Sequence, residues 1–207
     1  MRRRAIALLF LCCIMEKLKL NDSMQFVMVC AIFFAALQFF QQQFIYRHDI
    51  FFTQPWRWWT GHWVHVGWIH YLLNVLVFAC LPFLFPNIKK ISLIILLLLL
   101  PPLLSFSFYL IYPHIFAYAG LSGILHGLFI FCAIVSLKNK ADRHFSALII
   151  VIVLAKIIWE YYFGSLQTAQ LIGSPVLTQA HLLGVIFGGL LAVFILIFQL
   201  QVVQKNE

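Results

Sequence analysis

The chain has 207 residues, of which 64% are hydrophobic and only 10% are charged, and its formal net charge is +8. Soluble domains carry roughly 25% charged residues, so this composition excludes a soluble domain and indicates an integral membrane protein. The basic residues fall in short runs between apolar segments, with no basic domain or arm that would bind nucleic acid. The five cysteines form no Cys-x-x-Cys pair, so we expect no disulfide framework and no zinc site.

The N-terminal segment, residues 1–23, contains an apolar run from Ala5 to Met15 between basic residues. Such a run is too short for a membrane span, which needs roughly 20 apolar residues. No small-residue cleavage site follows it. We therefore interpret residues 1–23 as a cytoplasmic or interfacial segment, with an uncleaved signal-like start as the alternative.

Six apolar segments follow, which predicts an all-α polytopic membrane protein with six transmembrane helices over residues 24–200. The expected spans are Met24–Phe40, a second from near His62–Val66 to Phe85, Ile91–Tyr112, Gly120–Leu137, Ser146–Phe163 and Ala180–Leu200. The third contains Pro101-Pro102, but ten residues on one side are too few for a span, so we expect one kinked helix. The aromatic loop from Gln41 to Gly61 is expected to lie in the membrane interface.

Lysine and arginine gather on one side of this predicted topology. That side carries Arg2, Arg3, Arg4, Lys17, Lys19, Lys89, Lys90, Lys138, Lys140, Arg143 and Lys205. Loops on the other side contain only Arg47 and Arg57. The positive-inside rule then puts both termini, including the tail 201–207, in the cytoplasm. It also brings Ser122, His181 and His70 to a similar depth near the outer surface.

Ser122 and His181 each lie near the start of a predicted helix, and together they have the residue types of an acyl-transfer site. Serine is a poor nucleophile unless a base lies within hydrogen-bond reach. Both residues are followed by glycines at spacings that let two membrane helices approach closely, namely Gly123 and Gly127 after Ser122 and Gly184 and Gly188 after His181. We therefore expect the fourth helix to pack on the sixth and to bring Ser122 to His181.

Acyl transfer also needs hydrogen-bond donors directed at the developing oxyanion. His70 and Asn74 lie four residues apart on one helix face, and the amide of Ser122 belongs to a helix start, where amides lack intrahelical partners. Lys156 and Glu160 are also four residues apart, and we interpret them as a mutually neutralising pair without a catalytic role. No Asp or Glu accompanies His181 at a convincing position, which favours a Ser–His dyad over a triad.

Four motifs together resemble the rhomboid family of intramembrane serine proteases, over about residues 24–200. They are Gly120-x-Ser122-Gly123, Ala180-His181-x-x-Gly184-x-x-x-Gly188, His65-x4-His70-x3-Asn74 and the preceding Trp56-Arg57. The resemblance implies a six-helix fold, with Ser122 as nucleophile and His181 as base. It also implies His70, Asn74 and the Ser122 amide as oxyanion donors, and no cofactor or metal. The remaining residues of these motifs are expected to support the site.

One position departs from the family. Many rhomboids carry an aromatic residue four positions after the serine, stacked under the histidine, whereas this chain has His126. His126 either tunes His181, contacts an acceptor nucleophile, or packs under the dyad as a polar neighbour. This motif and the short chain are similar to rhombosortases, which implies a bacterial cytoplasmic membrane, an active site toward its outer side, and protein substrates with a C-terminal Gly-Gly, a transmembrane helix and a basic tail.

Two further segments suggest how a substrate enters. The loop Gly164–Gln179 is expected to act as a lid, and Trp159, Tyr161 and Tyr162 as a lateral gate, although interfacial anchoring explains these aromatics equally well.

The rival functions are a conventional rhomboid protease with other single-span substrates, a non-catalytic rhomboid-like protein that binds clients, and a haem protein that pairs histidines. A transporter is disfavoured, because a Lys–Glu pair supplies the only charges within a span and the chain shows no internal repeat.

Overall fold

The structure is a computed structural model that describes residues 22–165 and 168–198. The expected N-terminal segment, apart from its last two residues, and the cytoplasmic tail 201–207 lie outside the described residues. Six apolar helices form most of the rest: α2 (Asp22–Gln38), α5 (Trp68–Leu84), α6 (Lys90–Ile111), α7 (Ser122–Ser136), α8 (Arg143–Phe163) and α10 (Thr178–Ile197). By length and composition, α6, α8 and α10 are long enough to cross a membrane, and the other three are shorter apolar helices. The expected all-α membrane fold is confirmed.

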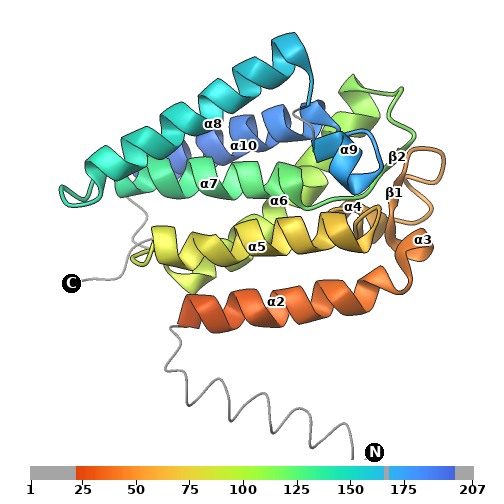
Figure 1. Ribbon diagram of the computed structural model, residues 1–207, viewed down its shortest axis with the longest axis horizontal. Coiled ribbons are helices and arrows are strands. Elements are labelled where there is room, and N and C mark those ends of the chain that lie inside the picture. The colour runs from red at the N-terminus through yellow and green to blue at the C-terminus, as the bar shows by residue number, and fades with distance from the viewer. Residues whose placement is uncertain (1–21, 166–167, 199–207) are drawn as a thin grey trace, which may run out of the picture.

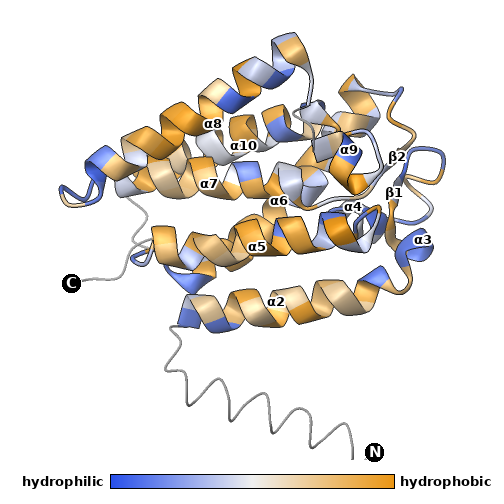
Figure 2. Cartoon of the chain, in the orientation of Figure 1, coloured by the Kyte–Doolittle hydropathy of each residue, from blue (hydrophilic) through white to orange (hydrophobic). Residues whose placement is uncertain are grey.

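These helices run side by side, with α2 at one edge of the bundle and α8 at the opposite edge (Figure 1). Hydrophobic residues dominate the helices, as the hydropathy colouring shows (Figure 2), and many large hydrophobic side chains are exposed. Leu76, Phe83 and Val151 are among the exposed ones. A helix with apolar side chains on its outer face is suited to a lipid environment, so this surface agrees with the membrane assignment.

Helix α6 contributes a continuous buried stripe to the core. Leu96, Leu100, Leu104 and Phe108 recur every four residues along it and are almost fully buried. Pro101 and Pro102 lie inside this one helix. The prediction of a single helix across the two prolines is therefore confirmed.

The loop that was expected to lie in the interface carries a small folded layer at one end of the bundle. It contains α3 (Gln41–Phe44), β1 (Tyr46–Arg47) and α4 (Arg57–Thr60). Strand β1 pairs antiparallel with β2 (Ala117–Tyr118), which directly precedes the Ser122 helix. The layer is thus tied to the segment that leads into α7 (Figure 1).

The second helix begins later than predicted. It starts at Trp68 after Gly67, whose backbone is extended, so the segment His62–Val66 precedes the helix and does not belong to it. The side chains of His62 and His65 are fully buried there. Gln38 of α2 fixes this segment, since its Nε2 donates to the His65 carbonyl (2.7 Å) and its Oε1 accepts from the His65 amide (2.7 Å). Buried histidines resemble an apolar helix start in the sequence, which is why the boundary was misplaced.

Candidate active site

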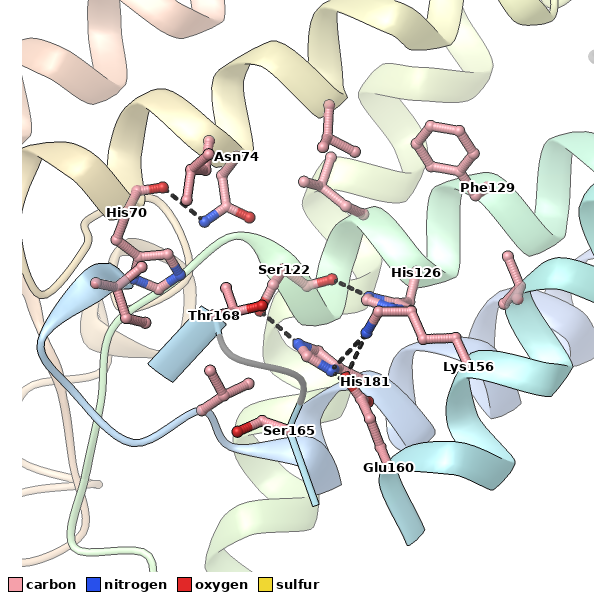
Figure 3. A pocket seen from close by; sticks show the side chains of 16 residues that line it. His70, Asn74, Ser122, His126, Phe129, Lys156, Glu160, Ser165, Thr168 and His181 are labelled. Carbon is pink, nitrogen blue, oxygen red and sulfur yellow. Dashed lines mark hydrogen bonds and ion pairs between the residues drawn. The ribbon is translucent and has the colours of Figure 1, made fainter. Parts of the chain in front are cut away.

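The first residue of α7, Ser122, lies beside His181 near the start of α10. Ser122 Oγ is 2.9 Å from His181 Nε2 (Figure 3). Ser122 is half-buried and His181 is 3% exposed. A hydroxyl and an imidazole nitrogen at this distance share a hydrogen bond, and this is the reach that a base needs to activate a serine.

The pair is brought together by a glycine contact between α7 and α10. A Cβ atom on Gly184 would lie only 1.9 Å from the Gly123 carbonyl oxygen, and one on Gly188 would lie 2.3 Å from the Gly127 carbonyl oxygen. No side chain fits at such distances, so the two backbones touch because both helices carry glycine there. The structure brings α7 and α10 together as the glycine spacing predicts. We call this contact the glycine seam.

Gly120 sets the approach of the chain to Ser122. It has a φ of +156°, and a Cβ on it would lie 2.8 Å from His70 Cε1. Its amide donates to the Gly61 carbonyl (3.1 Å), and its carbonyl accepts from the Tyr118 hydroxyl (2.7 Å). The turn before Ser122 is therefore held from both sides, with the His70 ring packed against it.

The far side of His181 faces a carboxylate, which the sequence interpretation missed. Glu160 of α8 is 6% exposed, and its Oε2 lies 2.7 Å from His181 Nδ1. Its other oxygen forms an ion pair with Lys156 one turn earlier on α8. The expectation that no Asp or Glu accompanies His181 was wrong, because Glu160 is brought to it by the packing of α8 against α10.

His126 lies one turn after Ser122 and packs against His181. The two imidazole rings are stacked, with centroids 4.2 Å apart and planes 18° apart. His126 Nδ1 is 2.7 Å from the Ser122 carbonyl oxygen, so this nitrogen carries a hydrogen and donates. His126 therefore occupies the stacking position of the aromatic residue that it replaces.

The proposed oxyanion donors lie on α5, across Ser122 from His181 (Figure 3). His70 and Asn74 both line the cavity that contains Ser122. Asn74 Nδ2 donates to the His70 carbonyl (3.0 Å), which orients the amide. His65 lies behind His70 with ring centroids 5.1 Å apart, and burial lowers the pKa of His65 to about 3. His65 is thus neutral at pH 7 and puts no charge behind this side of the cavity.

Trp56 and Arg57 lie away from Ser122, in the folded layer. The buried Arg57 guanidinium donates to the carbonyls of Ile45 (2.7 Å) and Gln42 (3.2 Å) and to the Gln54 side chain (2.6 Å). Trp56 is 47% exposed. Arg57 therefore stabilises the layer, and any support that it gives to the site is indirect.

A cavity of about 300 Å³ opens at Ser122 between α5, α7, α8 and α10. The lining is largely apolar away from Ser122, with Leu73, Val77, Leu125, Phe129 and Val153 among its members. Thr168 and Ile172 of the short helix α9 (Thr168–Ile172) also line it, so the segment predicted as a lid does border the cavity. Tyr161 and Tyr162 are largely exposed on α8 and do not line this cavity.

Among residues 22–165 and 168–198, no group of three or more His, Cys, Asp or Glu side chains is arranged to hold a metal ion.

A comparison with protein families finds that the Rhomboid domain matches residues 53–198. A comparison with curated proteins found no match. The matched segment contains the whole of α5, α6, α7, α8 and α10, and all the residues around the Ser122 cavity.

Proposed function

Because the chain belongs to the rhomboid family, which consists of intramembrane serine proteases, we propose that it is a protease in which Ser122 is the nucleophile and His181 the base. The observation that carries this proposal is the 2.9 Å separation of Ser122 Oγ and His181 Nε2 inside a cavity between apolar helices. We further propose that the protease domain spans residues 24–200, with cytoplasmic segments before and after it.

The reaction follows from that pair. As Ser122 Oγ bonds to the carbonyl carbon of the scissile peptide, its proton passes to His181 Nε2. The peptide C–N bond then breaks, and the same proton moves to the leaving amine. Water attacks the resulting ester, giving one proton to His181 Nε2 and its hydroxyl to the acyl carbon. The bond between Ser122 Oγ and the acyl carbon then breaks, and the proton passes from His181 to Ser122 Oγ, which regenerates the serine and releases the acid.

We propose that the oxyanion is stabilised by the Ser122 amide, Asn74 and His70. Ser122 is the first residue of α7, so its amide belongs to the turn whose amides lack intrahelical acceptors. Asn74 and His70 line the same cavity. Donors held in place before the reaction stabilise charge without reorganisation, at about 3–4 kcal/mol for each donor removed.

For the substrate, we propose a membrane-anchored protein cut near the outer end of its transmembrane helix at a C-terminal Gly-Gly signal, as in rhombosortases. A peptide bond inside a helix must be unwound before it can react, and each glycine weakens a helix by about 1 kcal/mol relative to alanine. The α5–α6 and α7–α8 connections, which contain Lys89, Lys138 and Lys140, lie at the end of the bundle opposite the start of α7 (Figure 1). This supports a cytoplasmic location for those connections and an outward-facing site in a bacterial inner membrane.

The test uses two membrane-anchored reporters, one with Gly-Gly before its span and one with another rhomboid-type site, each co-expressed with the protein. We expect the wild type to cut the Gly-Gly reporter and Ser122→Ala and His181→Ala to leave it intact. Product masses locate the cut. Matched controls are Ser136→Ala at the other end of α7 and His144→Ala on α8, which should cut normally.

Three results would contradict parts of the proposal. Cleavage by Ser122→Ala at the wild-type rate would remove the assigned nucleophile. Cleavage of the second reporter alone would remove the Gly-Gly specificity and leave a conventional rhomboid protease. Capture of both reporters without any cut would favour a client-binding protein.

A further inference from the structure

Glu160 uses both of its carboxylate oxygens within the site. Oε2 lies 2.7 Å from His181 Nδ1, and Oε1 forms the ion pair with Lys156. The carboxylate is almost fully buried, whereas the Lys156 side chain is 34% exposed. A buried charge must be paired to be tolerated, and Lys156 alone would satisfy that need. The second oxygen is nevertheless directed at the histidine that faces Ser122.

That contact fixes which nitrogen of His181 carries the proton. A carboxylate only accepts hydrogen bonds, so Nδ1 must hold the hydrogen and donate it to Glu160. Nε2 then presents its lone pair to the Ser122 hydroxyl, 2.9 Å away. This is the tautomer that a general base needs, and an imidazole with the opposite tautomer could not accept the serine proton.

We propose that Glu160 is a positioning residue for His181, so that the site works as a Ser122–His181–Glu160 triad held in place by Lys156. This proposal rests on the proposed function, since it requires His181 to be the base. Glu160 stays ionised throughout, while the proton moves only between Ser122 Oγ, His181 Nε2 and the leaving group.

The positive charge of Lys156 near His181 makes the Glu160 carboxylate more important for protonation of His181 than it would be if the two residues were isolated. Lys156 Nζ lies 3.4 Å from His181 Nδ1, and His126 from α7 stacks on the ring. From α5, His70 borders the same cavity. When His181 takes up the serine proton, a second cation forms beside Lys156. Among residues 22–165 and 168–198, Glu160 is the only carboxylate that lines this cavity. Without Glu160, the Lys156 ammonium would oppose the protonation on which the reaction depends.

The experiment measures the rate at which a fluorophosphonate probe, which labels activated serines, modifies Ser122 in the purified full-length protein in detergent between pH 5 and 9. The labelling rate does not depend on the identity of the protein substrate. We expect Glu160→Gln to slow labelling by at least about 100-fold. The acid limb of its pH–rate profile should also move to lower pH, because His181 binds a proton less readily without the carboxylate. Thermal unfolding of each variant is recorded in parallel.

The second variant separates positioning from support of the fold. Lys156→Met added to Glu160→Gln removes the opposing cation, and we expect it to recover about tenfold of the lost labelling rate. Asp49→Asn, in the exposed ion pair with Arg47, is the matched control and should label like the wild type.

The outcomes distinguish the two proposals. If the wild type and Ser122→Ala label equally, the proposed function fails. If the wild type labels at Ser122 but folded Glu160→Gln labels as fast, with an unmoved acid limb, only the triad fails. If Glu160→Gln lowers the unfolding temperature and the rate, but the acid limb stays in place, Glu160 has a structural role alone and the triad is again contradicted.

Discussion

The two sides of the Ser122 cavity are built in opposite ways. On one side, α7 and α10 meet at the glycine seam, where the backbones touch and Gly184 has no room for a methyl group. On the other side, α5, α8 and α9 border the cavity, and α8 ends in exposed aromatics such as Tyr161, which is 78% exposed. The serine and the histidine both belong to the first side. The proposed nucleophile and base are thus held together by backbone contact, whereas α8 and α9 belong to the segments predicted as a gate and a lid.

A change at the glycine seam should have the largest effect. Gly184→Ala forces the backbones of α7 and α10 apart, because its Cβ would lie 1.9 Å from the Gly123 carbonyl oxygen. We expect a loss of about 1–3 kcal/mol of stability or more. We also expect at least about a 100-fold loss of fluorophosphonate labelling, since a displacement near 1 Å has that effect. Thermal unfolding and labelling rates measure both.

The neighbouring glycine is the matched control. A Cβ on Gly189 would meet only Ile134 Cδ1, at 3.9 Å, which is an ordinary contact. Gly189→Ala should therefore label and unfold like the wild type. Equal behaviour of the two variants would show that the seam does not set the serine–histidine distance.

His126, which joins the seam to the site, should have an intermediate effect. Its ring stacks on His181 at 4.2 Å. If the flat ring is what holds His181 in place, His126→Phe keeps labelling within about threefold and His126→Ala loses about tenfold, in line with about 0.5–1.5 kcal/mol for an aromatic pair. If both variants lose labelling equally, a polar or proton-carrying role of His126 is favoured instead.

The smallest effect on stability is expected at the exposed end of α8. Replacing Tyr161 and Tyr162 by alanine should change stability by no more than about 0.5 kcal/mol, because both are surface side chains. If Tyr161 and Tyr162 form a gate, the alanine variant should cleave the membrane reporter faster than the wild type, while its labelling by the small probe stays constant. Phe83→Ala, an equally exposed aromatic on α5, is the control. Unchanged cleavage would leave interfacial anchoring as the explanation.

The helices and their closest contact could be predicted because short-range patterns determine them. Apolar length gave the helices to within a few residues at most ends, and the glycine spacings after Ser122 and His181 predicted that α7 and α10 would meet. The segment before Trp68 was misassigned, since buried histidines in a loop have no periodic pattern that separates them from a helix start.

Glu160 could not be paired with His181 by spacing, because the two lie 21 residues apart on different helices. Its partner depends on the crossing of α8 and α10, which no local pattern encodes. One signal was available: a carboxylate within an apolar span is costly and points to a functional site. The ion pair with Lys156 already accounted for the Glu160 charge, so the sequence interpretation sought no second partner and missed His181.

Helix α2 shows that the segment matched to a family and the segment needed to hold the site need not coincide. The matched segment begins at residue 53, so it leaves out α2. Yet α2 forms hydrogen bonds with the chain on both sides of the turn into α5. Gln38 binds the His65 backbone, and the Ala31 carbonyl accepts from the Tyr71 hydroxyl (2.8 Å). His70 is carried between these two anchor points. A protein trimmed to the matched segment would keep every residue of the proposed chemistry. It would lose the α2 hydrogen bonds that position the start of α5, and with it the His70 side of the Ser122 cavity.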